Sequence, residues 1–452
     1  MSEIINNIIV GLIAIFFFGS IFIHEQLAVI AYLLIFLLIF FGAKQAIQAL
    51  SLHFIILFLN PAIWSQPSWL NVMRWIVLFL AGIRIIPLLT IKSFVRYVFP
   101  LLVFMTMVIF LSYFASPYFN ISVLKVVNFA FYASVVLIAY NSLKIEELEQ
   151  LKKWFICIGV VIIFISIPTL AVPKIGYFRN GTGFQGIFNQ PQLFGTFLTP
   201  IIGFLFSDIL LKENKTRILK SIIFFLGLLL IYFSRSRTAL MAFLLCMGIT
   251  VLISISLQSI GLKKIIDSLS SFKIIFRVGI LLVFLVAISF HPSFSEKIDQ
   301  FWLKTSERGS VSAAFHESRG QGVVFCWNRF LKRPWTGNGF GIDVAHKNQR
   351  NIKTFMGIPI SAAAEKGFLP VAFLEEVGIL GLLFFLPFLA SFIWSALSTK
   401  DVRLMAVFSA CLFVNIGEAV FFSSGSLGGY LWLLMGLSTA GGWSRQQQSA
   451  LF

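Results

Sequence analysis

The sequence predicts an all-α, polytopic integral membrane protein: a bundle of transmembrane helices with one large loop on the outer side. The chain has 452 residues, of which 58% are hydrophobic and only 12% are charged. Its mean hydropathy is +0.93. A soluble protein of this length does not need so much apolar surface, whereas a protein that crosses a bilayer many times does. Many apolar runs are also near the roughly 20 residues that cross the bilayer core.

The apolar runs set the expected number of transmembrane helices. We expect twelve to fourteen, because the second to fourth of the fourteen runs are the weakest. The first run is not expected to be a cleavable signal, since it has neither a basic start nor a small-residue cleavage site. The runs lie at roughly 4–23, 27–42, 46–60, 68–88, 96–114, 121–142, 155–172, 191–211, 219–233, 238–257, 274–290, 369–397, 403–422 and 424–441.

One outer loop is too long to be a simple connector. It covers residues 291–368 and separates an N-terminal transmembrane bundle at 1–290 from C-terminal transmembrane helices at 369–452, all within one membrane domain. Inside the loop, apolar residues recur at helical spacing over 324–331, which predicts a short helix lying on the membrane surface. We expect Pro334 to end this helix before the glycine-rich stretch TGNGFGID.

Basic residues on alternate loops predict the orientation. The opposite short loops, at 24–26 and 60–67, contain no Lys or Arg, so the positive-inside rule places the basic loops and both termini in the cytoplasm. An even number of spans agrees with this placement. The topology also accounts for the net charge of +17 without a nucleic-acid partner. The basic residues of these loops are Lys44, Lys92, Arg96, Lys144, Lys152, Lys153, Lys212, Lys215, Arg217, Lys220, Lys263, Lys264, Lys273, Lys400, Arg403 and Arg445.

Four arginines on the outer side run against this charge bias. Arg179 lies in GYFRNGTGFQG, while Arg235 and Arg237 lie in FSRSRTA between two apolar runs. Arg74 is expected within about two helical turns of the outer face. The planar guanidinium matches phosphate oxygens, so converging arginines suit a diphosphate or an anionic lipid headgroup. Alternatively, the arginines reach ordinary membrane lipid phosphates or pair with Glu418.

Candidate acids and bases are few on the outer side. Glu365 and Lys366 precede a predicted span, and Glu375 and Glu376 lie near its outer end. A carboxylate that is partly shielded from water can have a raised pKa and serve as a general base. The alternatives are helix capping for Glu375 and Glu376 and a solvated pair for Lys366 and Glu365. His346, in the outer loop, is a further candidate base.

Other chemistries lack their motifs. No two histidines have metal-ligand spacing, no Asp-x-Asp motif occurs, and four cysteines suggest neither a disulfide framework nor a metal quartet. There is no Walker loop to support direct use of ATP. We therefore expect no metal and no cofactor, and we expect arginine to neutralise any phosphate.

Three stretches between residues 175 and 400 match motifs that occur together in one family. RNGTGFQGIFNQPQLFGTFL is similar to an outer loop of the Arg-x-x-Gly-x-Phe-x-x-Pro-Asn type, and FSRSRTALMAFLL to a Ser-Arg-Gly turn followed by an apolar helix. WNRFLKRPWTGNGFG, followed by FLEEVGILGLLFF, is similar to a glycine-rich loop and a Glu-x-Gly-x-x-Gly helix start. With these motifs, the chain resembles the O-antigen ligase and O-antigen polymerase family of bacterial envelope glycosyltransferases.

The resemblance implies a specific activity. Such proteins take a glycan from undecaprenyl pyrophosphate at the periplasmic face of the bacterial inner membrane and transfer it to an acceptor hydroxyl. The acceptor is lipid A-core for a ligase, or another lipid-linked glycan for a polymerase of O-antigen or exopolysaccharide. By position, Arg179 and either Arg235 or Arg237 bind the pyrophosphate and stabilise the charge of the leaving phosphate.

One departure from the family pattern affects the assignment. Ligases of the family usually carry a His-Asn pair before the Glu-x-Gly-x-x-Gly helix, whereas this chain has Glu365 and Lys366 there. Either Glu365 takes the role of the base, or His346 or Glu376 does. The departure slightly favours a polymerase over a lipopolysaccharide ligase. The alternatives are a transporter, such as a flippase for lipid-linked polysaccharide, and a scaffold whose outer loop binds a partner; a transporter would place its charges in a central cavity.

Overall fold

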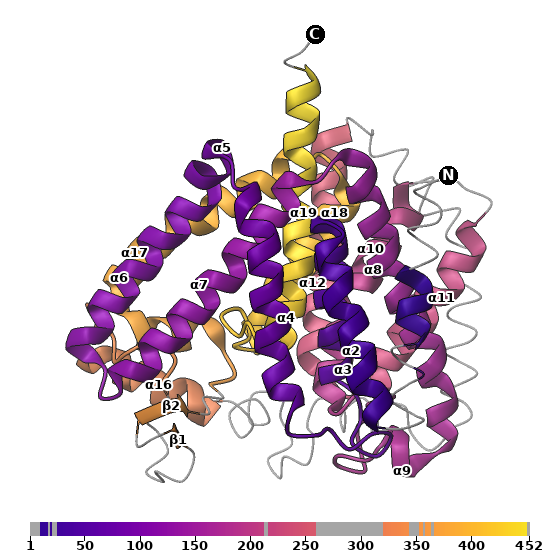
Figure 1. Cartoon of the computed structure of the whole chain (residues 1–452), viewed down its shortest axis with the longest axis horizontal. Helices are drawn as coiled ribbons and strands as arrows, with labels where there is room; N and C mark the ends of the chain where they lie inside the picture. Colours follow the sequence, from indigo (N-terminus) through magenta and orange to yellow (C-terminus); the bar gives the residue numbers. More distant parts are fainter. Residues whose placement is uncertain are drawn as a thin grey trace.

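The protein is a helical bundle, shown in Figure 1. The computed structural model describes residues 10–16, 19, 25–211, 216–258, 320–342, 352–355, 358–362 and 366–449. Within these ranges, a single two-stranded hairpin accompanies the helices. The predicted all-α, polytopic membrane helix bundle is confirmed.

Six of the described helices are long and apolar enough to cross a membrane. Many of their large apolar side chains are exposed, including Phe114, Leu383 and Trp394, as expected of surfaces that face lipid. The six candidate spans are Ile91–Ala115, Phe119–Ser142, Ile145–Ala171, Pro191–Leu211, Arg237–Ser256 and Leu369–Ser398. The shorter apolar helices are Leu27–Phe40, Ala43–Leu57, Val402–Gly417 and Leu427–Ala440.

The helices follow the predicted apolar runs. Every run has a matching helix except 4–23 and 274–290, which fall largely or wholly outside the described residues, so the total number of spans stays a prediction. The larger helices are α2 (Glu25–Phe40), α3 (Ala43–Leu57), α4 (Leu70–Ile85), α6 (Phe99–Ala115), α7 (Phe119–Ser142), α8 (Ile145–Ser166), α10 (Pro191–Leu211), α11 (Arg217–Phe233), α12 (Arg237–Gln258), α16 (Gln321–Lys332), α17 (Leu369–Ser398), α18 (Val402–Gly417) and α19 (Leu427–Ser449). The short segments are η1 (Ile86–Leu88), α5 (Ile91–Ser93), η2 (Phe94–Val98), η3 (Ile167–Ala171) and α9 (Pro173–Gly176).

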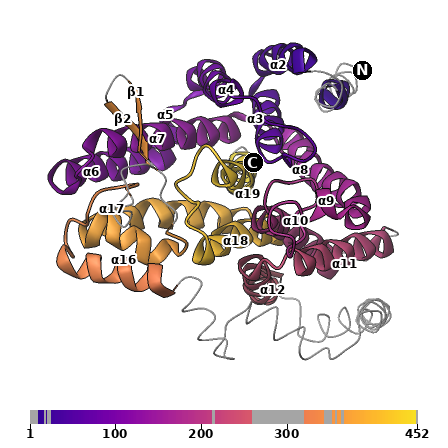
Figure 2. The same cartoon turned by 90° about the horizontal axis from the view of Figure 1, so that it is seen from below.

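Helix α19 lies at the centre of the bundle. In Figure 2 the other helices surround it, and α3, α7, α8, α10, α17 and α18 all contact it. Its Trp432 is fully buried, and the Trp432 ring centroid lies 5.1 Å from those of both Phe392 and Phe421. The neighbouring α10 is also buried along almost its whole length. A helix that is apolar on all sides suits such an interior position.

One end of the bundle gathers several of the basic loops. There Asp208 pairs with Lys220 at 2.5 Å and with Arg403 at 3.3 Å. Asp401 pairs with Arg403 at 3.0 Å and with Lys152 at 3.6 Å. These ion pairs connect α8, α10, α11 and α18. We call the end that these five residues define the basic end.

The loops at the other end, which we call the far end, pack against one another. The main-chain amide of Asn60, which follows α3, donates to the carbonyl oxygen of Ile187 at 2.8 Å. The Asn60 side-chain Nδ2 donates to the carbonyl oxygen of Ile175, also at 2.8 Å. Figure 1 shows α9, α16 and the hairpin at this end, opposite α5 and the C-terminus. The far end is therefore built from loops that lie far apart in the sequence.

The large outer loop contains the helix that the sequence predicts and a hairpin that it does not. Helix α16 ends two residues before Pro334, as expected. Strand β1 (Ile352–Phe355) pairs antiparallel with β2 (Ile358–Ala362). No alternation of polar and apolar residues marks these short strands clearly in the sequence, which is why we expected only a loop there.

Candidate functional site

The two segments that carry Arg179 and Arg235 lie side by side at the far end. The amide of Phe184 donates to the carbonyl oxygen of Phe233 at 2.9 Å, which joins the 176–185 loop to the end of α11. A Cβ atom on Gly183 would lie 2.9 Å from the carbonyl oxygen of Ser234, so the two backbones are in close contact. The structure thus brings together two segments that are about 50 residues apart in the sequence.

The Arg179 loop is held by two amide side chains. Asn180 Oδ1 accepts hydrogen bonds from the amides of Thr182 at 3.2 Å and Gly183 at 3.0 Å. Gln185 is fully buried, and its Oε1 accepts from the amide of Arg179 at 2.8 Å. These bonds satisfy main-chain donors that a turn leaves unpaired. They fix the backbone at Arg179 while its side chain remains exposed.

Arg235 sits in a strained turn between α11 and α12. Its φ of 53° is in the left-handed region, which costs a non-glycine residue about 1–2 kcal/mol. The amide of Arg235 donates to the carbonyl oxygen of Tyr232 at 3.0 Å, and the amide of Ser236 donates to Ser234 Oγ at 3.3 Å. The surrounding structure therefore imposes this conformation. Residues held in this way are concentrated at functional sites.

The guanidinium groups of Arg179 and Arg235 are both available to a ligand. Both residues are exposed, and neither side chain forms a hydrogen bond or an ion pair with any residue in the described ranges. Burial raises the pKa of the Tyr177 phenol, and the positive charge of Arg235 partly offsets the rise. Arg235 is thus close enough to influence the Arg179 loop electrostatically. Two such cations at one end of the bundle form a candidate anion-binding site.

Arg237 and Arg74, unlike Arg179 and Arg235, have contacts within the protein. Arg237 begins α12, is partly buried and has a partner within the protein. Arg74 Nη1 lies 3.4 Å from the carbonyl oxygen of Gly425, and its Cζ lies 5.4 Å from the centroid of the Trp75 ring. If either residue binds a ligand, it does so while it keeps these contacts or after it breaks them.

A second group of charges lies around α16 and the start of α17. Glu375 accepts hydrogen bonds from Arg329 Nε at 2.9 Å and from Lys366 Nζ at 2.5 Å. Glu376 accepts from Lys366 Nζ at 2.8 Å and from the amide of Gly341 at 2.9 Å. We call Glu375 and Glu376 the α17 glutamate pair. Each carboxylate has a cationic partner, which is what a buried charge requires.

This arrangement overturns two alternative interpretations of the sequence. The α17 glutamate pair does not cap a helix, because the first turn of α17 contains no acidic residue. Lys366 is not part of a solvated pair either, because only 6% of its side chain is exposed. Burial opposes the charge of Lys366, but the α17 glutamate pair more than compensates and raises the pKa of this lysine. Lys366 is therefore an ionised, internal partner of both carboxylates.

The glycine-rich loop after α16 fills a break in α17. At Gly378 the backbone leaves the helical region, with φ 66° and ψ −169°. The amide of Asn338 donates to the carbonyl oxygen of Glu375 at 2.9 Å, and the amide of Ile379 donates to that of Pro334 at 2.8 Å. The loop therefore pairs with main-chain groups that an unbroken helix would have satisfied itself.

Two glycines permit this close approach. Gly337 and Gly378 both have positive φ. A Cβ atom on Gly337 would overlap the main chain of Glu376, and one on Gly378 would overlap that of Trp335. The glycine-rich loop and the start of the Glu-x-Gly-x-x-Gly helix, which are separate motifs in the sequence, thus form one structural unit.

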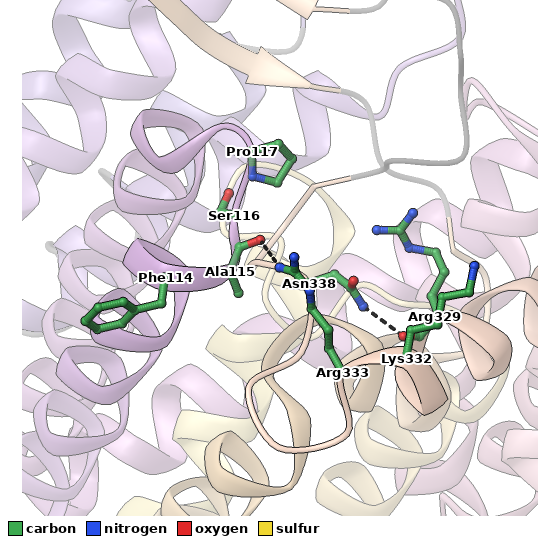
Figure 3. Close-up of a pocket in the computed structure, with 8 residues that line it drawn as sticks. All are labelled: Phe114, Ala115, Ser116, Pro117, Arg329, Lys332, Arg333 and Asn338. Carbon is green, nitrogen blue, oxygen red and sulfur yellow. Dashed lines mark hydrogen bonds between the residues drawn. The ribbon is translucent and has the colours of Figure 1, made fainter.

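A cavity of about 490 Å³ opens beside this unit, as Figure 3 shows. One wall is the end of α6 and the following residues, 114–117. The other wall comes from α16 and the loop after it. There Arg333 Nη1 donates to the carbonyl oxygen of Ala115 at 3.1 Å, and Asn338 Nδ2 donates to that of Arg329 at 3.2 Å. Lys332 completes this basic wall.

The loop from 418 to 426, between α18 and α19, contacts α10, the glycine-rich loop and Arg74. Gln192 of α10 donates through Nε2 to Glu418, next to the start of α12. The Phe422 ring centroid lies 5.4 Å from that of Phe340, in the glycine-rich loop. Gly425 contacts Arg74. This loop therefore contacts α10 on one side and the glycine-rich loop on the other.

The predicted site residues thus fall into groups at the same end of the bundle. No contact within the described part of the chain joins Glu376 directly to Arg179 or Arg235. The other two candidate bases, Glu365 and His346, lie outside the described residues. Sequence analysis missed Arg329, Lys332 and Arg333, although all three belong to the loop at 291–368 that it predicts on the outer side, where cations run against the charge bias.

The described residues contain no group of three or more His, Cys, Asp or Glu side chains that could hold a metal ion. No protein-family model and no curated protein matches the sequence.

Proposed function

We propose that the protein is a membrane glycosyltransferase that moves a glycan from undecaprenyl pyrophosphate to an acceptor hydroxyl during synthesis of a surface polysaccharide. The reaction takes place at the far end, which faces the periplasm when the basic end faces the cytoplasm, and both termini are then cytoplasmic. The acceptor is another lipid-linked glycan in preference to lipid A-core, because the His-Asn pair of the ligases is missing.

The observation that carries this proposal is the pairing of the Arg179 loop with the Arg235 turn. A lipid pyrophosphate brings two adjacent phosphates to the membrane surface, and each phosphate presents oxygens that match a guanidinium. Arg179 and Arg235 offer two exposed guanidiniums on neighbouring segments whose backbones are fixed by hydrogen bonds. A site of this kind neutralises a pyrophosphate without a metal ion.

The chemistry follows from this placement. The acceptor hydroxyl attacks the anomeric carbon of the glycan as the bond between that carbon and the phosphate oxygen breaks. The electron pair of the broken bond moves to the pyrophosphate, where the two arginines stabilise the developing charge. A base takes the proton of the hydroxyl. Glu365 remains our first candidate for this base, with His346 and Glu376 as the others.

The far end could join donor and acceptor through the 418–426 loop. This loop contacts the elements around the Arg179–Arg235 site on one side and the glycine-rich loop on the other. In this proposal the acceptor lies on the side of the α17 glutamate pair, which bonds to Lys366, the neighbour of Glu365 in the sequence.

The break in α17 at Gly378 favours a second candidate, a transporter for lipid-linked glycan, because discontinuous helices often form transport sites. Reconstitution of the purified protein with a lipid-linked oligosaccharide, without ATP or divalent metal, separates the candidates. Longer lipid-linked chains support a polymerase, and transfer that requires lipid A-core supports a ligase. Movement of the lipid across the bilayer with no new glycosidic bond would exclude the glycosyltransferase.

A further inference from the structure

The cavity beside α16 lies at the end of a candidate span, which is the level of the headgroups when that span crosses a membrane. One of its walls starts where the candidate span Ile91–Ala115 ends, and α17 begins its own span nearby at Leu369. Tyr113 and Phe114, in the last turn of α6, are 64% and 66% exposed. Aromatic side chains at the end of a span are typical of the membrane interface.

Helix α16 has the two faces of a helix that lies in this interface. Its Val324, Trp327 and Leu331 are exposed and follow the i, i+3, i+7 spacing of a single face. Its basic residues Arg329 and Lys332 point away from that face by helical geometry, and Arg333 follows directly after the helix. The apolar face suits the acyl region of the bilayer, and the basic face borders the cavity.

The cavity has more positive than negative charge. It is lined by Arg329, Lys332 and Arg333, and Arg329 is joined to Lys366 through the α17 glutamate pair. The three cavity cations and Lys366 carry four positive charges, and the α17 glutamate pair carries two negative charges. This leaves a surplus of two positive charges. The surplus is on the cavity side, since both carboxylates are already bonded to cations or to a main-chain amide.

Several donors remain for a ligand. Lys332 is exposed and forms no ion pair or hydrogen bond with any described residue. Arg333 uses one nitrogen for the carbonyl oxygen of Ala115, and Arg329 uses Nε for Glu375, so both retain further N–H groups. In Figure 3 the charged ends of Arg329 and Lys332 extend from α16 in the same direction. These are the donors that a phosphate group requires.

We propose that this cavity binds the phosphate of an anionic phospholipid, and that the bound lipid holds α16 against the ends of α6 and α17. The site is separate from Arg179 and Arg235, on the opposite side of the far end in Figure 2, where α16 and α9 lie apart. The proposal does not depend on the glycosyltransferase function. A phosphate ester is the chemistry recognised, and its source is either a lipid headgroup or a soluble phosphate.

The test is native mass spectrometry of the purified full-length protein with phosphatidylglycerol, phosphatidylcholine or inorganic phosphate added. We expect phosphatidylglycerol to be retained in preference to phosphatidylcholine. Lys332→Gln and Arg333→Gln should each weaken its retention about tenfold, the effect of losing one charge-assisted contact. Lys174→Gln is the matched control, because Lys174 is an exposed lysine of the far end outside the cavity.

Each result has a definite meaning. If only the two cavity variants lose phosphatidylglycerol, and inorganic phosphate does not compete with it, the lipid site is supported. Displacement of the lipid by inorganic phosphate would overturn the lipid assignment in favour of a soluble phosphate. Equal retention by the wild type, both cavity variants and the Lys174→Gln control would overturn the site altogether. Lys332 has no described partner to lose, so Lys332→Gln is expected to fold normally.

Discussion

The main-chain amide of Phe184 donates to the carbonyl oxygen of Phe233, with 2.9 Å between nitrogen and oxygen. This bond places the loop that carries Arg179 beside the turn that carries Arg235. We predict both cations on the outer side, where the charge bias of a membrane protein disfavours them, and backbone geometry keeps their segments together.

Removing either arginine should sharply lower production of the surface polysaccharide in cells. Arg179→Ala and Arg235→Ala each delete a charge-assisted contact worth about 1.5–3 kcal/mol, or roughly tenfold to 150-fold in turnover. The measurement is the amount of polymer on the cell surface, normalised to the amount of protein in the membrane. Lys174→Ala serves as a control for loss of positive charge at the far end. Normal polymer in both arginine variants would remove the donor site from our account.

The shape of the guanidinium should matter as well as its charge. Arg179→Lys and Arg235→Lys preserve the charge but replace a planar fork by a single ammonium, which cannot make the same paired bonds to phosphate. We expect each variant to lose most of its transfer activity in the reconstituted assay. Full activity of both lysine variants would show that the site provides only a general positive potential.

Glu375 should be essential for stability. Its carboxylate is 2% exposed and is bonded to Arg329 and Lys366. Glu375→Gln therefore removes the negative charge that neutralises these two cations. Breaking a buried pair in this way costs about 3–5 kcal/mol. The control is Glu149→Gln, since Glu149 is half exposed in its pair with Lys152 and should cost less than about 1 kcal/mol. Thermal unfolding in detergent measures the stability of both variants. Equal unfolding midpoints for Glu375→Gln and Glu149→Gln would contradict the buried network.

Gly337→Ala and Gly378→Ala should both destabilise the far end. Each new Cβ would overlap main-chain atoms of the opposing segment and would also occupy a left-handed conformation. We expect partial unfolding that is visible as faster proteolysis near α16. Gly248→Ala in α12 is the matched control, because nothing lies within 4 Å of its Cβ and alanine favours a helix. Proteolysis at the control rate in both variants would argue against the close approach.

The contribution of Lys366 to stability should be constant across neutral pH. Its folded pKa is raised, so its contribution is fully present below the unfolded pKa of about 10.4 and is lost as pH rises through the folded pKa. The difference in unfolding midpoint between the wild type and Lys366→Gln should therefore be flat from about pH 7 to pH 9. A difference that shrinks within this window would mean that burial, and not the α17 glutamate pair, controls the lysine.

Much of the fold could be predicted from the sequence, because apolar runs of bilayer length have few alternatives in a membrane protein. Helix α10 and the end of α16 lie where composition and Pro334 place them. The break in α17 could not be predicted in this way. Gly378 sits in an apolar run that reads as one continuous span, and its conformation depends on bonds from the loop around Pro334.

The candidate site was only partly predictable. The charge bias of the loops identified Arg179 and Arg235, and the structure shows that their segments touch. The burial of Lys366 depends on how α17 packs against the glycine-rich loop, which no local pattern in the sequence records. Ion pairs between distant segments need the tertiary structure, since the partners of Glu375 come from α16 and from the residue 366 region.

The most direct test of the central claim is the affinity of the purified protein for undecaprenyl pyrophosphate, measured for the wild type, Arg179→Ala, Arg235→Ala and the Lys174→Ala control. If the two arginines bind the pyrophosphate, each arginine variant will bind at least about tenfold more weakly than the wild type, and the control will not. Equal affinity in all four proteins would contradict the account, because the paired segments would then have no part in recognising the donor.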